Sequence, residues 1–439
     1  MRRGAFAGCH WVGRSLGDRM AGFGVWLRRL LGGGKDPDVG PSVPLAPTPP
    51  GGPTSLAEGN NGFALAMYRA LGQRPGNLLF SPFSIRAALT MTQAGARGET
   101  AAQMSEVLRT SSLDESADVV LAAMTQRPNA ASGRKCEISV VNSLWCQDGA
   151  PLQAGFLDLI DRHYPGGVNL VDFRRAGENA RVAINRWVED NTRQKIRDLI
   201  PAGSLDAYTR LVLVNAVYFK GMWVLKFSRG ATRDEPFYME GGGLVHAPLM
   251  HQKQAAWYVR GPDYQAVDLD YQGSGLSMLV LLPDRKDGLR DLEQRLSARM
   301  LGGSVGLMSL CEINFFLPRF KIAWGTVDLR DPLADLGMTL PFNPSQADFS
   351  GINGYQPPHE EALFISAVLH KARVEVNEEG TKAAAATAVD MHLLGSIGPP
   401  PPTQVPVVRA DHPFLFAIRE RRSGGILFLG RMADPTREN

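Results

Sequence analysis

The sequence is poor in the residues and motifs that most often reveal a protein's chemistry. It holds four cysteines in 439 residues, too few and too scattered for a disulfide framework, and none forms a C-x-x-C pair. Cys136 and Cys146 could form a bridge, but buried free thiols are favoured. The chain also lacks a Walker loop, a dinucleotide fingerprint after a strand and an H-E-x-x-H motif, so no metal or cofactor is expected.

A strong net charge and a long apolar run are missing as well. The formal net charge is only +3, and no run of Lys or Arg interleaves with aromatics, so a nucleic-acid partner is not expected. The apolar stretch at residues 23–31 contains Arg28 and Arg29 and is too short to span a bilayer, so no transmembrane segment is expected. No N-x-S/T sequon has an allowed middle residue, so glycosylation gives no evidence for export.

The first 55 residues differ from the rest. Residues 1–35 are rich in Arg and Gly, and residues 36–53 are rich in Pro and Gly with few apolar side chains. We expect residues 1–55 to be a disordered extension and linker, in which a weak targeting segment could lie. Residues 56–435 contain no second linker of comparable length before a loop at about 378–410, so they are predicted to form a single domain.

Within this domain, helices crowd the first half and strands the second, which predicts an α+β fold. Apolar residues recur at helical spacing in residues 56–71 and 85–93, where Ser84 could cap the second helix, and in the longer stretch 178–200. Strands are expected at residues 138–145, 211–219, 276–282, 311–323 and 426–429. The second of these strands is apolar on both faces, as expected for a central strand.

One catalytic pattern is present. Residues 302–306, GGSVG, fit the G-x-S-x-G motif with which an α/β-hydrolase exposes its serine nucleophile. That motif needs a strand before the serine and a helix after it, whereas the residues before Ser304 are predicted to be helical. The glycines are better explained as a helix stop and a turn, so Ser304 is not predicted to be catalytic.

The most informative segment is rich in small residues. Residues 375–389 include Gly380, Thr381 and the four alanines at 383–386. An Ala-rich helix is one interpretation. However, the segment has no stripe of large residues, and the prolines at 399–402 stop any helix that follows. The other interpretation is a strand, because side chains this small can enter a gap between two strands without clashing with the residues already packed there.

This segment resembles the hinge of the serpin family. From Glu378 to Ala388, the residues EEGTKAAAATA match the pattern of inhibitory serpins except at Lys382, where the family usually has an acidic residue. The resemblance covers about residues 56–435. Further segments resemble serpin motifs in the family's order: NLLFSPFSI (77–85), GARGET (95–100), LVNAVYFKGMW (213–223), LPRF (317–320), DFSG (348–351), His370-Lys371 and DHPFLF (411–416).

The resemblance implies a serpin fold with three β-sheets, eight or nine helices and an exposed reactive-centre loop. It also implies a suicide-substrate inhibitor of serine proteases. The protease attacks the loop and forms an acyl-enzyme, and the cleaved loop then inserts into the main sheet as a new strand. The implied partner is a serine protease bound covalently to a chain that is otherwise a monomer. Most serpins are extracellular, so an extracellular location is expected, with an intracellular one as the alternative.

The residues that the resemblance carries over form two groups. In an inserted strand, alternate hinge side chains starting from Thr381 would face the core, whereas Lys382 would face solvent. The hinge consists of Glu378, Glu379, Gly380, Thr381, Ala383, Ala385 and Thr387. The residues that support the opening sheet, called the shutter and the breach, are Ser81, Ser84, Asn215, Lys220, Trp223 and His370.

The family's spacing from hinge to cleaved bond predicts a reactive bond at Leu394–Gly395. The loop is longer than usual, so Met391, Leu393 and Gly395 are alternatives for the residue before the bond. A leucine there suits chymotrypsin-, subtilisin- or elastase-like proteases, and trypsin-like ones are disfavoured because no Arg or Lys lies between residues 382 and 409. The main rival hypothesis is a non-inhibitory serpin acting as carrier, storage protein or chaperone, whose hinge would usually be bulkier or charged.

Overall fold

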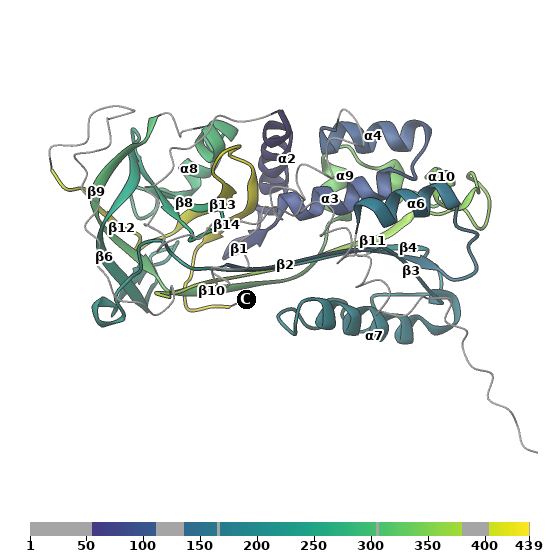
Figure 1. Cartoon of the computed structure of the whole chain (residues 1–439), viewed down its shortest axis with the longest axis horizontal. Helices are drawn as coiled ribbons and strands as arrows, with labels where there is room; N and C mark the ends of the chain where they lie inside the picture. The colour runs from purple at the N-terminus through teal and green to yellow at the C-terminus, as the bar shows by residue number, and fades with distance from the viewer. Residues whose placement is uncertain (1–54, 111–135, 165–166, 304–306, 380–403, 439) are drawn as a thin grey trace, which may run out of the picture. The chain divides into compact units, whose positions relative to one another are not determined.

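The structure is a computed structural model, and it describes residues 55–110, 136–164, 167–303, 307–379 and 404–438. These residues form eight α-helices and two hydrogen-bonded sheets (Figure 1). The predicted α+β class is therefore confirmed. The helices are α2 (Ser55–Leu71), α3 (Pro82–Gln93), α4 (Gly98–Leu108), α6 (Ala154–His163), α7 (Phe173–Asn191), α8 (Leu289–Gln294), α9 (Arg330–Asp335) and α10 (Ser350–Asn353).

The five-stranded sheet is built around a strand that is apolar on both faces. This central strand is β4, in which every residue but one is buried. One of its faces packs with α2, α3 and α4, and the other packs with α7, so neither face meets water. The strand order is β10 (Phe320–Asp328), β11 (Ile365–Val376), β4 (Leu211–Gly221), β2 (Cys136–Gln147) and β3 (Val168–Val171).

The nine-stranded sheet has two parts that share β6. Residues 244–249 of β6 pair with β5, residues 249–258 pair with β9, and residues 257–260 pair with β7. These two parts and the five-stranded sheet make up the three predicted sheets. The strands are β1 (Leu78–Phe80), β14 (Ile426–Met432), β13 (Phe414–Glu420), β8 (Leu276–Pro283), β7 (Tyr264–Asp270), β6 (Leu244–Arg260), β9 (Ser309–Pro318), β12 (Val407–Arg409) and β5 (Arg233–Tyr238).

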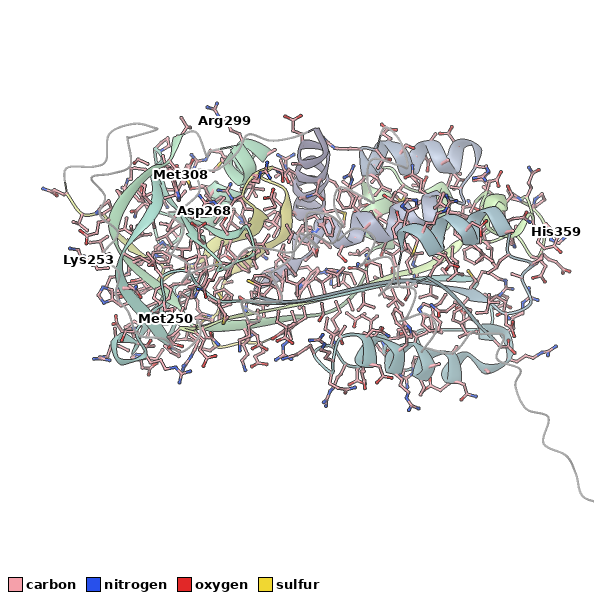
Figure 2. All side chains as sticks on the ribbon, viewed as in Figure 1. Met250, Lys253, Asp268, Arg299, Met308 and His359 are labelled. Atoms are coloured by element: carbon pink, nitrogen blue, oxygen red, sulfur yellow. The ribbon has the colours of Figure 1, made fainter. Side chains whose placement is uncertain are left out.

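A buried ion pair lies in the nine-stranded sheet. Arg419 of β13 donates a hydrogen bond of 2.8 Å to Asp268 of β7, and the two side chains are 1% and 0% exposed. Figure 2 labels Asp268 among the side chains of this sheet. Burial alone would raise the pKa of Asp268, but the charges of Arg419 and Arg421 hold it below its usual value. Asp268 is therefore ionised, and it depends on the neighbouring guanidinium for its solvation.

Three cysteines lie among the described residues, and all three are buried free thiols: Cys136, Cys146 and Cys311. The possible bridge between the first two is not formed, which confirms the prediction of free thiols. Burial raises the pKa of Cys146 to about 12, so it remains protonated and unreactive at neutral pH.

Two predicted elements had the wrong bounds. The helix predicted at 178–200 is α7, which begins earlier because Asp172 caps it, its carboxylate accepting from the backbone N–H of Arg175. It ends at Asn191, and Arg193 and Gln194 then adopt positive φ angles of 50° and 61°, which a helix cannot continue. The strand predicted at 311–323 is two strands in different sheets, β9 and β10, which meet at Pro318 and Arg319. A proline inside a strand pattern is the signal for such a break.

The predicted cap of α3 was also wrong. Ser81, not Ser84, is the N-cap, and its hydroxyl accepts from the backbone N–H of Ser84 at 3.2 Å. Pro82 occupies the first helical position, where a missing N–H costs nothing. The side chain of Ser84 is therefore free to make a different contact.

Candidate functional site

The candidate site is the line along which β4 and β11 pair, here called the seam. These two strands are parallel, and their register runs from Leu211 opposite Ile365 to Lys220 opposite Glu375. On either side of the seam the next strands, β2 and β10, pair antiparallel. The chain leaves β11 directly into the residues that the sequence predicts to be the hinge. A strand that follows β11 and runs antiparallel to both of its neighbours would fit between β4 and β11, because these two strands are parallel.

A hydrogen-bonded cluster closes the middle of the seam. Asn215 of β4 and His370 of β11 are register partners, and His370 Nδ1 contacts Asn215 Oδ1. The backbone N–H of Ser81 donates to His370 Nε2 at 3.3 Å, so Nε2 is the acceptor and Nδ1 carries the proton. Burial lowers the pKa of His370 to about 3, so the ring is neutral at physiological pH. The cluster thus ties both strands to the cap of α3.

The same cluster includes a residue that the sequence analysis missed. Asn142 of β2 lies opposite Asn215 in the register, and its Oδ1 accepts from Asn215 Nδ2 and, at 3.1 Å, from Ser84 Oγ. The signal that could have found it is an amide side chain in the middle of a strand, directly after the apolar pair Val140 and Val141. Four predicted residues, Ser81, Ser84, Asn215 and His370, are therefore brought together around a fifth.

The hinge end of the seam is held by side chains from distant parts of the chain. Glu378 is almost fully buried, and its Oε1 accepts from Thr232 Oγ1 at 2.8 Å and lies 3.5 Å from Arg319 Nη1. Its neighbour Glu379 is about half exposed and forms an ion pair with Arg229. These residues line an open cleft of about 620 Å³. Sequence reasoning missed Thr232, Arg319 and Arg229, because nothing local marks them as hinge contacts.

Two predicted residues lie at the same end. Trp223 is buried, stacks on Tyr271 with ring centroids 4.4 Å apart, and donates from Nε1 to the Asn377 carbonyl at 2.9 Å. Lys220 is at the last register pair of the seam, where its Nζ lies 3.7 Å from Glu375. Trp223 thus fixes the residue before Glu378, and Lys220 ties β4 to β11 just below it.

Comparison with known protein families identifies the family to which a chain with this fold and this seam belongs. Residues 58–435 match the family described as "Serpin (serine protease inhibitor)". The chain belongs to the serpin family. The resemblance seen in the sequence is therefore confirmed, and membership places the chain among inhibitors of serine proteases rather than among enzymes.

Similar serpins come from distant organisms. The chain is 40% identical to the leukocyte elastase inhibitor of Sus scrofa over 394 residues, covering 87% of this chain and 99% of that one. It is 37% identical to an uncharacterized serpin-like protein of Thermococcus kodakarensis, covering 85% of this chain and 84% of that one.

Solved serpin structures share the fold. Uncleaved ovalbumin matches with a TM-score of 0.77 at 28% identity, over 87% of this chain and 100% of that one. The native stressed conformation of Arabidopsis AtSerpin1 matches with a TM-score of 0.76 at 28% identity, over 88% of this chain and 100% of that one.

The far end of the serpin loop is anchored as firmly as the hinge. Strand β12 pairs in parallel with β9, and Arg409 at its end bonds to Asp411 at 2.9 Å and pairs with Glu235 of β5. The Arg409 guanidinium also lies 4.7 Å from the centre of the Phe316 ring. The loop between Glu379 and β12 therefore starts and ends at fixed points of the fold.

Several predicted residues lie outside the part of the serpin that the structure describes. They are Ser304, the hinge residues Gly380, Thr381, Ala383, Ala385 and Thr387, and the reactive-bond candidates Met391, Leu393, Leu394 and Gly395. The predicted extension at residues 1–55 also falls almost wholly outside it. Among the described residues there is no cluster of three His, Cys, Asp or Glu side chains suited to a metal ion, and no helix long and apolar enough to cross a membrane.

Proposed function

We propose that the chain inhibits serine proteases by inserting its cleaved reactive-centre loop into the seam. The observation that carries this proposal is the pairing of β4 with β11, which is closed along its whole length while the hinge leaves from the end of β11. A strand inserted there would pair with both neighbours and complete an antiparallel arrangement on each side. The backbone bonds and burial gained in this way supply the driving force, and the native form is a kinetic trap.

The chemistry belongs to the protease, and the serpin supplies the motion. The protease serine attacks the loop and forms an acyl-enzyme, and cleavage frees the hinge from its anchor at β12. Insertion then carries the attached protease along the sheet and distorts its active site before water can hydrolyse the ester. Inhibition is thus a race between insertion and deacylation, and its product is a covalent complex of one protease with one serpin monomer.

The hinge composition fits this race. Thr381, Ala383, Ala385 and Thr387 are the residues whose side chains would enter the core of the sheet, and all four are small. Lys382 lies between two of these positions in the sequence, so in an inserted strand its side chain would point to the opposite face, toward solvent. Its departure from the family pattern therefore does not oppose insertion. The short side chains also weigh against the carrier, storage or chaperone alternative, in which the hinge need not enter the sheet.

The target is proposed to be an elastase- or chymotrypsin-like protease. The bond is placed at Leu394–Gly395 by the spacing from Gly380, and an apolar residue before the bond suits such primary pockets. The similar relatives named leukocyte elastase inhibitor support the same class of target. Met391 and Leu393 remain alternative positions, and mass spectrometry of the cleaved chain distinguishes them.

The clusters at the seam are proposed to control its opening. Ser81, Ser84, Asn215 and His370 form the shutter, since their contacts across β4 and β11 must break when the strands part. Lys220 and Trp223 act at the breach, where the hinge would enter first. Both sets therefore stabilise the closed state against premature insertion.

The deciding experiment is incubation of the full chain with chymotrypsin and with neutrophil elastase, followed by a denaturing gel. A stable adduct of higher mass, together with a large rise in melting temperature of the loop-cleaved chain, supports the proposal. Clean cleavage without adduct by proteases of several classes contradicts it and favours the carrier hypothesis.

The location of the protein stays a prediction, extracellular or alternatively intracellular. Fractionation of cells that express the full chain, with the medium analysed separately, tests it.

A further inference from the structure

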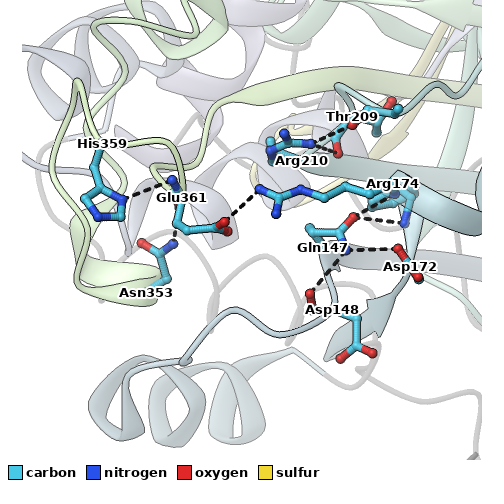
Figure 3. Close-up of polar contacts among 11 residues, drawn as sticks. Gln147, Asp148, Asp172, Arg174, Thr209, Arg210, Asn353, His359 and Glu361 are labelled. Carbon is cyan, nitrogen blue, oxygen red and sulfur yellow. Dashed lines mark hydrogen bonds and ion pairs between the residues drawn. The ribbon is translucent and has the colours of Figure 1, made fainter.

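The end of the seam far from the hinge is closed by a different set of contacts. Beyond the pair Leu211–Ile365, the backbone N–H of Arg210 donates to the Ser366 hydroxyl at 2.9 Å, and β11 has a register irregularity at this point. The last bond across the seam is therefore made by a side chain rather than by the backbone ladder. Figure 3 shows Arg210 beside Arg174 at this end of the sheet.

The first turn of α7 is attached to the β2–β4 side of the seam. Gln147, the last residue of β2, accepts from the backbone N–H groups of Phe173 and Arg174 at 2.9 and 3.1 Å (Figure 3). Further along, the rings of Trp145 and Trp187 pack edge to face at 5.7 Å. These contacts attach α7 to β2, although residues 197–199 after the helix accept hydrogen bonds from Lys371 of β11 and Thr326 of β10. Arg174 itself is attached to β2 through Gln147, so it would move with β2 when the seam opens.

An ion pair ties the first turn of this helix to the opposite side of the seam. Arg174 Nη2 lies 2.8 Å from Glu361 Oε1, and Glu361 lies four residues before β11. Glu361 is fixed in its own loop, because its N–H donates to His359 Nδ1 at 3.0 Å and its carbonyl accepts from Asn353 Nδ2 at 2.7 Å. The pair thus joins the first turn of α7, which lies before a kink at Ala176, to the loop before β11 (Figure 3).

We propose that Arg174 and Glu361 form a catch that resists the final stage of loop insertion. The inference rests on the proposed function. A strand that enters at the hinge would open the seam progressively toward Leu211 and Ile365, so the catch lies among the contacts that would break late, beside the bond between Arg210 and Ser366. The two residues are positioning residues, since they touch neither the protease nor the scissile bond. They govern whether the trapped protease is carried the full distance, not how fast it binds.

The test compares E361Q and R174A with a matched control on the same helix. Glu178 and Arg181 form an ion pair at 2.6 Å within α7 that does not cross the seam, so E178Q removes a similar surface contact without touching the catch. Each full-length variant is mixed with chymotrypsin under conditions where the wild-type chain is partly cleaved as a substrate. The ratio of covalent adduct to cleaved serpin and the second-order association rate constant are then measured.

We expect E361Q and R174A to raise the ratio of adduct to cleaved serpin about two- to five-fold, the size that a partly exposed ion pair allows. The association rate constant should not change, and E178Q should match the wild type in both measurements. The double variant should gain little beyond either single one. A wild-type adduct whose ratio is unchanged by E361Q and R174A overturns the catch alone. Absence of any wild-type adduct overturns the proposed function and the catch together.

Discussion

His370 and Asn215 hydrogen bond to each other from opposite sides of the seam, and they are register partners on the two strands. Both side chains are buried, and the second ring nitrogen of His370 accepts the backbone N–H of Ser81. The two strands are thus joined by a side-chain contact in addition to their backbone ladder. Because every member of this contact is buried, removing one partner leaves the other without compensation.

Replacing Asn215 by alanine should lower the free energy of unfolding by about 1–3 kcal/mol, because it leaves the buried His370 N–H without its acceptor and removes the amide that donates to Ser84 and Asn142. Urea unfolding of the full chain measures the change. Asn179, exposed on α7, provides the control, and N179A should change the free energy by less than about 0.5 kcal/mol. Equal effects of the two substitutions would contradict the role of the buried cluster.

Acid should weaken the fold through His370. Burial lowers the pKa of His370 in the folded state to about 3, below the ordinary 6.5, so the unfolded chain binds the proton more tightly. Stability from this group is complete above pH 6.5 and falls as the pH drops toward 3. Between pH 7.5 and pH 5 the loss is about 2 kcal/mol. Urea unfolding at both pH values measures it, and H370Q, which cannot titrate, should lose correspondingly less over the same interval.

The two glutamates at the hinge should differ in their effect on stability. E378Q removes an ion pair with Arg319 at a side chain that is 6% exposed, whereas E379Q removes the pair with Arg229 at a side chain that is 48% exposed. We expect E378Q to cost about 1–3 kcal/mol and E379Q less than about 1 kcal/mol. Thermal unfolding compares them. A larger loss of stability for E379Q than for E378Q would show that the burial of the glutamate does not decide how much its ion pair contributes to stability.

The buried pair in the nine-stranded sheet should be costly to break. D268A leaves Arg419 buried and uncompensated, and it should destabilise the fold by about 3–5 kcal/mol. The matched control is D263A, which breaks an ion pair to Arg295 whose two side chains are about half exposed, and it should cost less than about 1 kcal/mol. Both are read from urea unfolding curves, and similar losses for the two variants would refute the prediction.

The alternation of core-facing and solvent-facing side chains expected in an inserted hinge gives a functional prediction. T381R places a long charged side chain at a position that would face the core, so it should slow insertion and convert the serpin into a substrate of its target protease. K382R keeps a charge at the neighbouring position, which would face solvent in an inserted strand, and should leave inhibition unchanged. The amount of denaturation-resistant adduct measures both effects. Unchanged adduct formation by T381R would argue against insertion of this segment.

Much of the fold and part of the site could be predicted from the sequence. Strand β4 was found because a run apolar on both faces has few alternatives to a central strand. The end of α7 was missed because Arg193 and Gln194 adopt a left-handed conformation, which is uncommon for arginine and glutamine and is not predicted by their residue types. The sequence pattern within a segment predicts which secondary structure the segment favours. Where a helix ends against its own pattern, as α7 does, the end depends on contacts with the rest of the chain.

Contacts between distant residues were the hardest to foresee. Thr232 and Glu378 are 146 residues apart, and they come together because Thr232 precedes β5 of one sheet while Glu378 follows β11 of the other. Asn142 likewise joins the shutter because β2 pairs with β4 in one particular register. The family resemblance supplied some partners of this kind, but Asn142, Arg229 and Arg319 needed the folded chain.

The anchoring of β12 beside β9 has a consequence for how much of this protein a cell or tissue requires. Arg409 holds that end of the loop, and in the proposed mechanism a cut within the loop is what releases the chain that fills the seam. Each molecule that inserts its loop cannot return to the starting form, because the peptide bond is gone. Protection would then scale with the number of molecules synthesised, not with a turnover rate.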